Sequence, residues 1–176
     1  MFIRPRSRTL GKAQQSARCK TVRPRLEMLE DRLTPSGWSA LPTGTLSNLA
    51  AAWGSSPSDI FAVGAGGTIL HSTNDGATWS AQNSGTTQDL SGVWGLGPND
   101  VFAVGADGAI LRSTNDGATW SAQNSGTMQN LNSIWGVGPN DVFAVGAGGT
   151  VLHSTNDGAT WAAQASNTTL TLTSVW

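Results

Sequence analysis

Residues 72–85 read STNDGATWSAQNSG, and residues 113–126 repeat these fourteen letters without a change. A third, shorter copy at 154–161 reads STNDGATW. The tryptophans extend the pattern, because all eight fall into two series with a constant spacing of 41 residues. Large residues at a fixed spacing indicate one structural unit copied along the chain. The two series are Trp38, Trp79, Trp120 and Trp161, and Trp53, Trp94, Trp135 and Trp176.

One copy, residues 90–126, contains four short runs that favour β-structure. Gly-Pro-Asn follows the first run, and Asp-Gly pairs follow the second and third, so each run ends at a turn signal. Short strands joined by tight turns form an up-and-down antiparallel sheet. The predicted strands are 90–96, 101–105, 109–113 and 118–123.

Both faces of this predicted sheet are apolar. In the second strand Val101 and Ala103 point one way, and Phe102 and Val104 point the other. A sheet that is apolar on both faces must be covered on both faces, and stacked copies of itself provide that cover. Radial stacking gives a β-propeller of four-stranded blades with the polar fourth strand outermost. The main rival is a parallel β-helix, whose coils are usually about half as long as this repeat.

Charge divides the chain of 176 residues into two parts. Residues 1–36 carry nine Lys or Arg against three acidic residues, whereas residues 37–176 carry only Arg112 against eight aspartates. An acidic repeat region does not favour nucleic-acid binding, because it cannot neutralise phosphates. No apolar run is long enough for a membrane span. The single Cys19 excludes an intrachain disulfide and a cysteine-based metal site.

Residues 1–36 are predicted to be a disordered basic leader, with at most a short helix over 25–32. They lack the apolar run of a secretory signal peptide. Residues 23–36, RPRLEMLEDRLTPS, resemble an element found near the start of many large planctomycete proteins that are predicted to be exported or surface-exposed. The resemblance implies an address tag and hence a secreted or cell-surface location. Residues 37–176 are predicted to form the propeller blades.

The STNDGATW segments resemble the Asp-box, or BNR repeat, of pattern S-x-D-x-G-x-T-W. This resemblance implies a hairpin between the third and fourth strands of blades, as in sialidases, sortilin-like receptors and photosystem II assembly-factor-like proteins. The preceding FAVG…G-T-[IV]-L-H-S-T pattern is most similar to the last group. An Asn stands in the usual Asp position, and its side-chain oxygen can still cap the turn. The predicted structural box residues are Ser72, Asn74, Asp75, Gly76, Thr78, Trp79, Ser113, Asn115, Asp116, Gly117, Thr119, Trp120, Ser154, Asn156, Asp157, Gly158, Thr160 and Trp161.

The remaining conspicuous side chains are given structural roles. We expect Trp79, Trp120 and Trp161 to pack onto the blade that each one closes. His71 and His153 are equivalent positions at which the middle copy has Arg112, so we interpret all three as residues at a solvent-exposed strand end. The repeated aspartates before the second strand fit a turn better than calcium ligation. We predict no catalytic, cofactor-binding or metal-binding residue. The aspartates are Asp59, Asp100 and Asp141.

Incomplete copies flank about three complete blades. Residues 37–43 match the end of a unit and are predicted to be a lone fourth strand, while residues 170–176 are predicted to be a lone first strand. A closed propeller needs at least about four blades. We therefore expect a partial propeller from a longer or truncated protein, with open blade edges that favour self-association.

The leading functional hypothesis is a non-enzymatic, exported or cell-surface scaffold that binds an unknown protein or a surface polymer. One alternative is a photosystem II assembly-factor-like propeller that binds a membrane protein. That resemblance implies a basic binding patch, whereas the repeat region is acidic. Another is a BNR-type glycoside hydrolase that lacks its catalytic part. Sialidase chemistry needs an arginine cluster and a tyrosine, and the repeat region has one arginine and no tyrosine.

Overall fold

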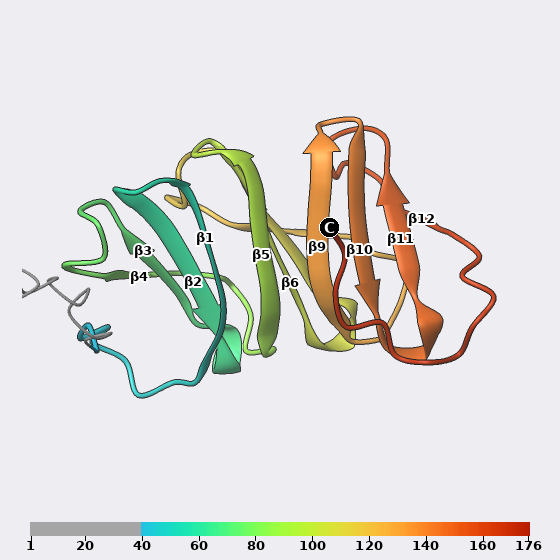
Figure 1. The fold of residues 1–176 in the computed structure, drawn as a ribbon, viewed down its shortest axis with the longest axis horizontal. Coiled ribbons are helices and arrows are strands. Elements are labelled where there is room, and N and C mark those ends of the chain that lie inside the picture. Colours follow the sequence, from blue (N-terminus) through green and yellow to red (C-terminus); the bar gives the residue numbers. More distant parts are fainter. Residues whose placement is uncertain (1–39) are drawn as a thin grey trace, which may run out of the picture. The chain divides into compact units, whose positions relative to one another are not determined.

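The computed structural model describes residues 40–176, which form three four-stranded antiparallel sheets (Figure 1). In every sheet each strand pairs with the next one in the chain, as predicted. The predictions for residues 1–36 and Trp38 lie outside the described residues. The first sheet contains β1 (Leu49–Ser56), β2 (Asp59–Gly64), β3 (Ile69–Ser72) and β4 (Ser80–Gln82). The second sheet contains β5 (Leu90–Gly97), β6 (Asp100–Gly105), β7 (Ile110–Ser113) and β8 (Ser121–Gln123). The third sheet contains β9 (Leu131–Gly138), β10 (Asp141–Gly146), β11 (Val151–Ser154) and β12 (Ala162–Ala163).

The fourth strand begins later than the sequence predicts. We expected it over 118–123, but β8 starts at Ser121, so Trp120 belongs to the preceding turn. The cause is local, because the side chain of Asn115 accepts the N–H of Thr119 at 2.9 Å. This hydrogen bond draws Thr119 into the turn and away from the sheet ladder.

A short 3-10 turn joins the second and third strands of each sheet. These turns are η1 (Ala65–Gly67), η2 (Ala106–Gly108) and η3 (Ala147–Gly149). In η2 both Asp107 (φ 53°) and Gly108 (φ 71°) have the positive φ expected of the Asp-Gly pair.

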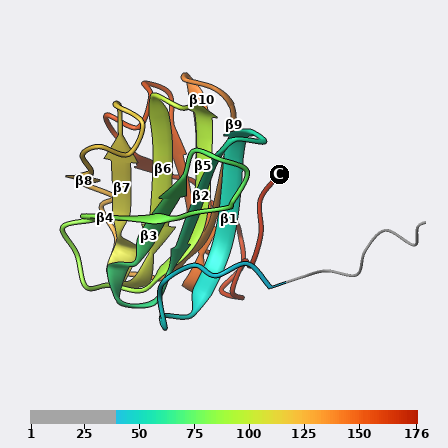
Figure 2. The ribbon, with the colours of Figure 1, turned by 90° about the vertical axis from the view of Figure 1, so that its left-hand side faces the viewer.

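The sheets pack side by side, with the second sheet between the other two (Figures 1 and 2). The first strands of neighbouring sheets are in contact, β1 with β5 and β5 with β9. One apolar core lies between the first and second sheets and includes Phe61, and another lies between the second and third and includes Phe102. Strand β6 is buried on both faces, as predicted for a sheet covered by copies of itself. The architecture is therefore an unclosed partial β-propeller.

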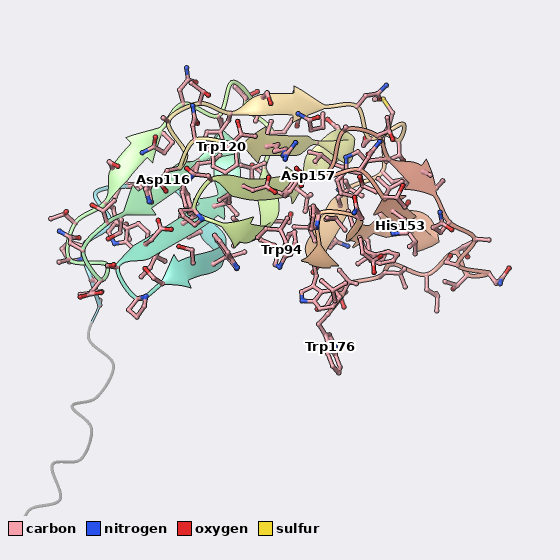
Figure 3. All side chains as sticks on the ribbon, turned by 90° about the horizontal axis from the view of Figure 1, so that it is seen from above. Trp94, Asp116, Trp120, His153, Asp157 and Trp176 are labelled. Atoms are coloured by element: carbon pink, nitrogen blue, oxygen red, sulfur yellow. The ribbon has the colours of Figure 1, made fainter. Side chains whose placement is uncertain are left out.

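From residue 40 onward, neither flanking segment forms the strand that the sequence predicts. Residues 40–43 contain no strand; instead Leu41 packs beside Gly76, with its Cδ1 3.3 Å from where a Cβ on that glycine would lie. Residues 170–176 run along the third sheet, where the N–H of Leu172 bonds to the carbonyl of Gly146 at 2.9 Å. A strand requires a continuous ladder, and among residues 40–176 no adjoining strand supplies one to either segment. Trp176 is 92% exposed and points away from the sheets (Figure 3).

Candidate functional site

The hairpin between the third and fourth strands is held by its own side chains. The buried hydroxyl of Ser113 accepts the N–H of Gly117 at 2.9 Å. The amide of Asn115 accepts the N–H of Thr119 and donates to its Oγ1, both at 2.9 Å. Positive φ at Asp116 (56°) and Gly117 (76°) completes the turn. The same bonds recur in the other copies, among Ser72, Asn74, Gly76 and Thr78 and among Ser154, Asn156, Gly158 and Thr160.

These bonds predict how Asn115 responds to substitution. Asn115→Asp keeps the oxygen that accepts the N–H of Thr119, and Thr119 Oγ1 can then donate instead of accept. We expect a change below about 0.5 kcal/mol in the free energy of unfolding. Asn115→Ala removes the acceptor and is expected to cost about 1–2 kcal/mol. Urea denaturation of the three proteins tests this, and equal losses in both variants would contradict the role of the oxygen.

The box tryptophans contact the preceding sheet as well as their own, so they do more than close the blade to which each one belongs. Trp120 meets Phe61 edge to face, with ring centroids 6.0 Å apart, and Trp161 meets Phe102 in the same way at 6.4 Å. Gly117 allows this close approach of the hairpin to Phe61, because a Cβ at position 117 would lie 2.6 Å from Phe61 Cε1. The missing side chain lets the phenyl ring of one sheet lie against the hairpin of the next.

The other tryptophan series also bridges neighbouring sheets. Trp53 in β1 lies over Gly95 in β5, where an added Cβ would be 2.7 Å from the indole Cη2. Trp94 in β5 lies over Gly136 in β9 in the same way, at 2.9 Å. Each indole therefore fits into the space left by a glycine in the next sheet.

The residues at positions 71, 112 and 153 are not simple exposed strand ends, which corrects the sequence interpretation. His71 is 6% exposed, and its ring stacks on Phe61 with the centroids 4.1 Å apart. Its Nε2 lies 2.6 Å from Asp59 Oδ1. His153 is more exposed and repeats the arrangement on Phe143 and Asp141, with a 2.8 Å contact to the carboxylate. The register of β2 with β3, which pairs Phe61 with His71, produces this stacking.

Arg112 connects two sheets through carboxylates. Its Nε donates to Asp100 Oδ1 at 2.8 Å, and its Nη2 donates to Asp157 in the hairpin of the third sheet. The guanidinium also lies over the ring of Phe102, 5.3 Å from the centroid. Burial raises the pKa of Asp100, while the hydrogen bond from Arg112 opposes that rise. We name Asp100, Arg112 and Asp157 the second interblade cluster.

The first interblade cluster consists of the equivalent residues Asp59, His71 and Asp116. Here His71 Nε2 lies 3.6 Å from Asp116 Oδ1 in the hairpin of the second sheet. Burial raises the pKa of Asp116, and the nearby carboxylate of Asp59 raises it further, while His71 lowers it. Sequence reasoning missed both clusters, although a signal exists: an Asp precedes each of positions 71, 112 and 153 by 12 residues.

Three pockets lie at equivalent places beside the box tryptophans. They measure about 500 Å³ at Trp79, 340 Å³ at Trp120 and 300 Å³ at Trp161. Their walls are Ser, Thr, Asn, Gln, Gly and aliphatic residues together with the indole, and none of the three contains a His, Asp or Arg. These pockets can hold a ligand by shape and neutral hydrogen bonds, and they offer no acid or base. In the part of the chain from residue 40 onward, no helix has the length and apolar character of a membrane span.

Comparison with known proteins supports the propeller architecture. Residues 96–172 match the model of the DUF6242 beta propeller domain. No curated protein matches the sequence. YCF48 from Cyanidioschyzon merolae superposes with a TM-score of 0.63 at 24% identity, over 72% of this chain and 42% of that chain. YCF48 bound to D1 peptide gives a TM-score of 0.61 at 18% identity, over 71% and 41% of the two chains.

An ancestral GH74 enzyme is also similar, with a TM-score of 0.56 at 21% identity over 68% of this chain and 19% of that chain. The chain thus spans about two fifths of the length of the YCF48 structures. The likeness to BNR repeats stays a prediction, because the matching family model is that of another propeller domain. What the comparisons show is the fold of a β-propeller domain, of which this chain carries three sheets.

Proposed function

We propose that this chain is a non-enzymatic, exported or cell-surface scaffold whose propeller sheets bind a protein partner. The observation that carries the proposal is a pair of exposed apolar side chains, Leu96 (40% exposed) and Val137 (68% exposed). They occupy equivalent positions near the ends of β5 and β9. Because β5 and β9 are equivalent strands that pack against each other, the two residues lie at the same end of their sheets. We call them the apolar pair.

The kind of partner follows from the apolar pair and from the charge of residues 37–176. Isolated exposed apolar side chains are ordinary, whereas neighbouring ones rimmed by polar surface favour a protein-binding site. Eight aspartates against one arginine favour a partner surface that is neutral or basic. The likeness to a propeller structure with a bound peptide, YCF48 bound to D1 peptide, is compatible with a polypeptide ligand. A membrane-protein partner is the alternative that the resemblance to photosystem II assembly-factor-like repeats implies.

A capture experiment with a matched control tests the scaffold role. The full chain is crosslinked to its partners on native cells, alongside a Leu96→Ser/Val137→Ser variant and a Met128→Ser variant. Met128 is 79% exposed but lies outside the apolar pair, so its substitution removes a comparable apolar group elsewhere. We expect one protein to be captured by the wild type and by Met128→Ser and lost with the double variant.

The captured protein, once purified, should bind the double variant at least about 10-fold more weakly than the wild type. Equal affinity for all three chains would overturn the assignment of this surface. Recovery of an integral membrane protein would select the assembly-factor alternative.

Location is tested separately with the leader. Residues 1–36 are fused to a reporter protein and expressed in a planctomycete host, next to a leader in which Glu30, Asp31 and Arg32 are replaced by Ala. We expect the intact leader to place the reporter outside the cytoplasm and the substituted leader to retain it. Retention of both fusions would remove the export part of the proposal and leave the binding part standing.

Self-association is expected from the outer faces of the first and third sheets. Strand β1 is mostly exposed, whereas the equivalent β5 and β9 are largely buried against a preceding sheet. Phe143 is half-buried, whereas the equivalent Phe61 and Phe102 are fully buried. These are the two unlike halves of one interface, so two copies can associate head to tail once residues 170–176 are displaced from the third sheet. Analytical ultracentrifugation should show a mass that rises with concentration, and a monomer at every concentration would contradict this expectation.

A further inference from the structure

The two interblade clusters share one geometry but differ in charge. In each cluster a side chain from the third strand lies between a carboxylate of its own sheet and a carboxylate of the next sheet. In the second cluster that side chain is Arg112, a permanent cation that bonds to both carboxylates. The fold therefore provides a place for positive charge between two carboxylates at the boundary of the second and third sheets.

At the boundary of the first and second sheets, His71 stands where Arg112 stands in the next copy. Unlike a guanidinium, an imidazole in its neutral form brings no charge to balance the carboxylates of Asp59 and Asp116. It does bring a nitrogen ligand, and His71 is buried with its Nε2 facing both carboxylates. Stacking on Phe61 fixes the orientation of the ring. Exchange of Arg for His thus replaces a built-in cation with a potential ligand for one.

The distances among these groups suit a small metal ion. One ligand atom from each of Asp59, His71 and Asp116 lies within 4.8 Å of the other two. Three ligands about 2.0–2.2 Å from a zinc ion lie roughly 3.3 Å apart. The 3.6 Å from His71 to Asp116 already matches this spacing, and the 2.6 Å to Asp59 must widen slightly. Asp116 lies on the hairpin and is partly exposed, so it can adjust and the ion can enter.

We propose that Asp59, His71 and Asp116 form a binding site for one divalent transition-metal ion, best suited to Zn²⁺, that joins the first sheet to the second. One imidazole nitrogen and two carboxylate oxygens are ligands that zinc accepts, whereas calcium and magnesium prefer oxygen alone. Water or another ligand completes the tetrahedron. The ion takes the place that the guanidinium of Arg112 takes between the second and third sheets. The proposal is independent of the proposed scaffold function, because it concerns contacts inside the partial propeller.

The third copy supplies an internal control. His153 stacks on Phe143 and contacts Asp141, as His71 does with its own neighbours. Among the described residues no carboxylate from a further hairpin approaches His153. A histidine and one aspartate alone provide two ligands, so metal affinity at this position is expected to be low.

The test is titration of the full chain with ZnCl₂ by calorimetry. All proteins carry Cys19→Ser, so that the leader thiol does not bind the ion. We expect one Zn²⁺ per chain and a higher thermal midpoint in its presence. Co²⁺ in place of Zn²⁺ should give the visible absorption bands of tetrahedral coordination, which report the geometry around the ion.

Three variants decide the outcome. His71→Arg reproduces the second cluster, in which this fold already accommodates arginine, and should abolish the tight site. Asp116→Asn keeps a residue type that tolerates positive φ and should weaken binding at least about 10-fold. His153→Arg should leave stoichiometry and affinity unchanged. The proposal is overturned if the wild type binds no ion, or if its affinity persists in both His71→Arg and Asp116→Asn.

Discussion

Gly108→Ala is expected to lower the free energy of unfolding by about 3 kcal/mol or more. Gly108 has φ +71°, where an L-residue is strained, and a Cβ there would lie 2.1 Å from the carbonyl oxygen of Thr127. Thr127 lies in the segment before β9, and the clash is with its backbone, so rotating a side chain cannot relieve it. The loss should appear as a lower denaturation midpoint in urea.

Gly126→Ala is the matched control for this variant. Gly126 has the same φ of +71°, but no heavy atom lies within 4 Å of its added Cβ. It should cost only the backbone strain, about 1 kcal/mol. The difference between the two variants measures the contact of η2 with the segment before β9, and equal losses would show that this contact is not tight.

Phe102→Ala is expected to lower the free energy of unfolding by about 3–5 kcal/mol, because it leaves a cavity in the core between the second and third sheets. The ring is fully buried, stacks with Trp94 at 6.3 Å, meets the edge of Trp161 at 6.4 Å and lies under the guanidinium of Arg112. Loss of the phenyl removes contacts from all three partners. Calorimetric unfolding of both proteins measures the effect.

Phe143→Ala provides the comparison, since Phe143 lies in the same DVFAVG sequence and pairs in the same register. It is only half-buried, and no tryptophan of a further sheet packs on it among residues 40–176. We expect a loss of about half that of Phe102→Ala or less. Similar losses would mean that the phenyl groups act within their own sheets and not between sheets.

The sequence predicts the sheets well because their signals are local. Turn residues such as Asp107 and Gly108 separate the strands, and the two apolar faces of 101–104 require neighbours on both sides, which the structure confirms. Strand ends were predicted less well, since the bond from Asn115 to Thr119 that delays β8 depends on a side-chain orientation.

Contacts between sheets were the part that could not be predicted. The spacing of 41 residues shows which positions are equivalent, but it does not show which residue of the next copy each side chain meets. Because Arg112 occupies the position of His71 in the next copy, the sequence suggested that this position tolerates different side chains and is exposed to solvent. In the structure both residues lie against a phenyl ring and between carboxylates, and such a site accepts either planar side chain.

Trp53 packs over Gly95, and Trp94 packs over Gly136 in the same way. This repeated contact affects how the number of units in a chain can change during evolution. Each unit carries both a tryptophan that packs on the next unit and a glycine that leaves space for the tryptophan of the preceding one. After the insertion or deletion of a whole unit, the units that become neighbours therefore still have matching surfaces. Duplication or loss of a whole unit in the gene should therefore preserve folding and alter only the number of sheets. A shift by part of a unit would place a ring against a side chain that fills this space, and selection should remove it.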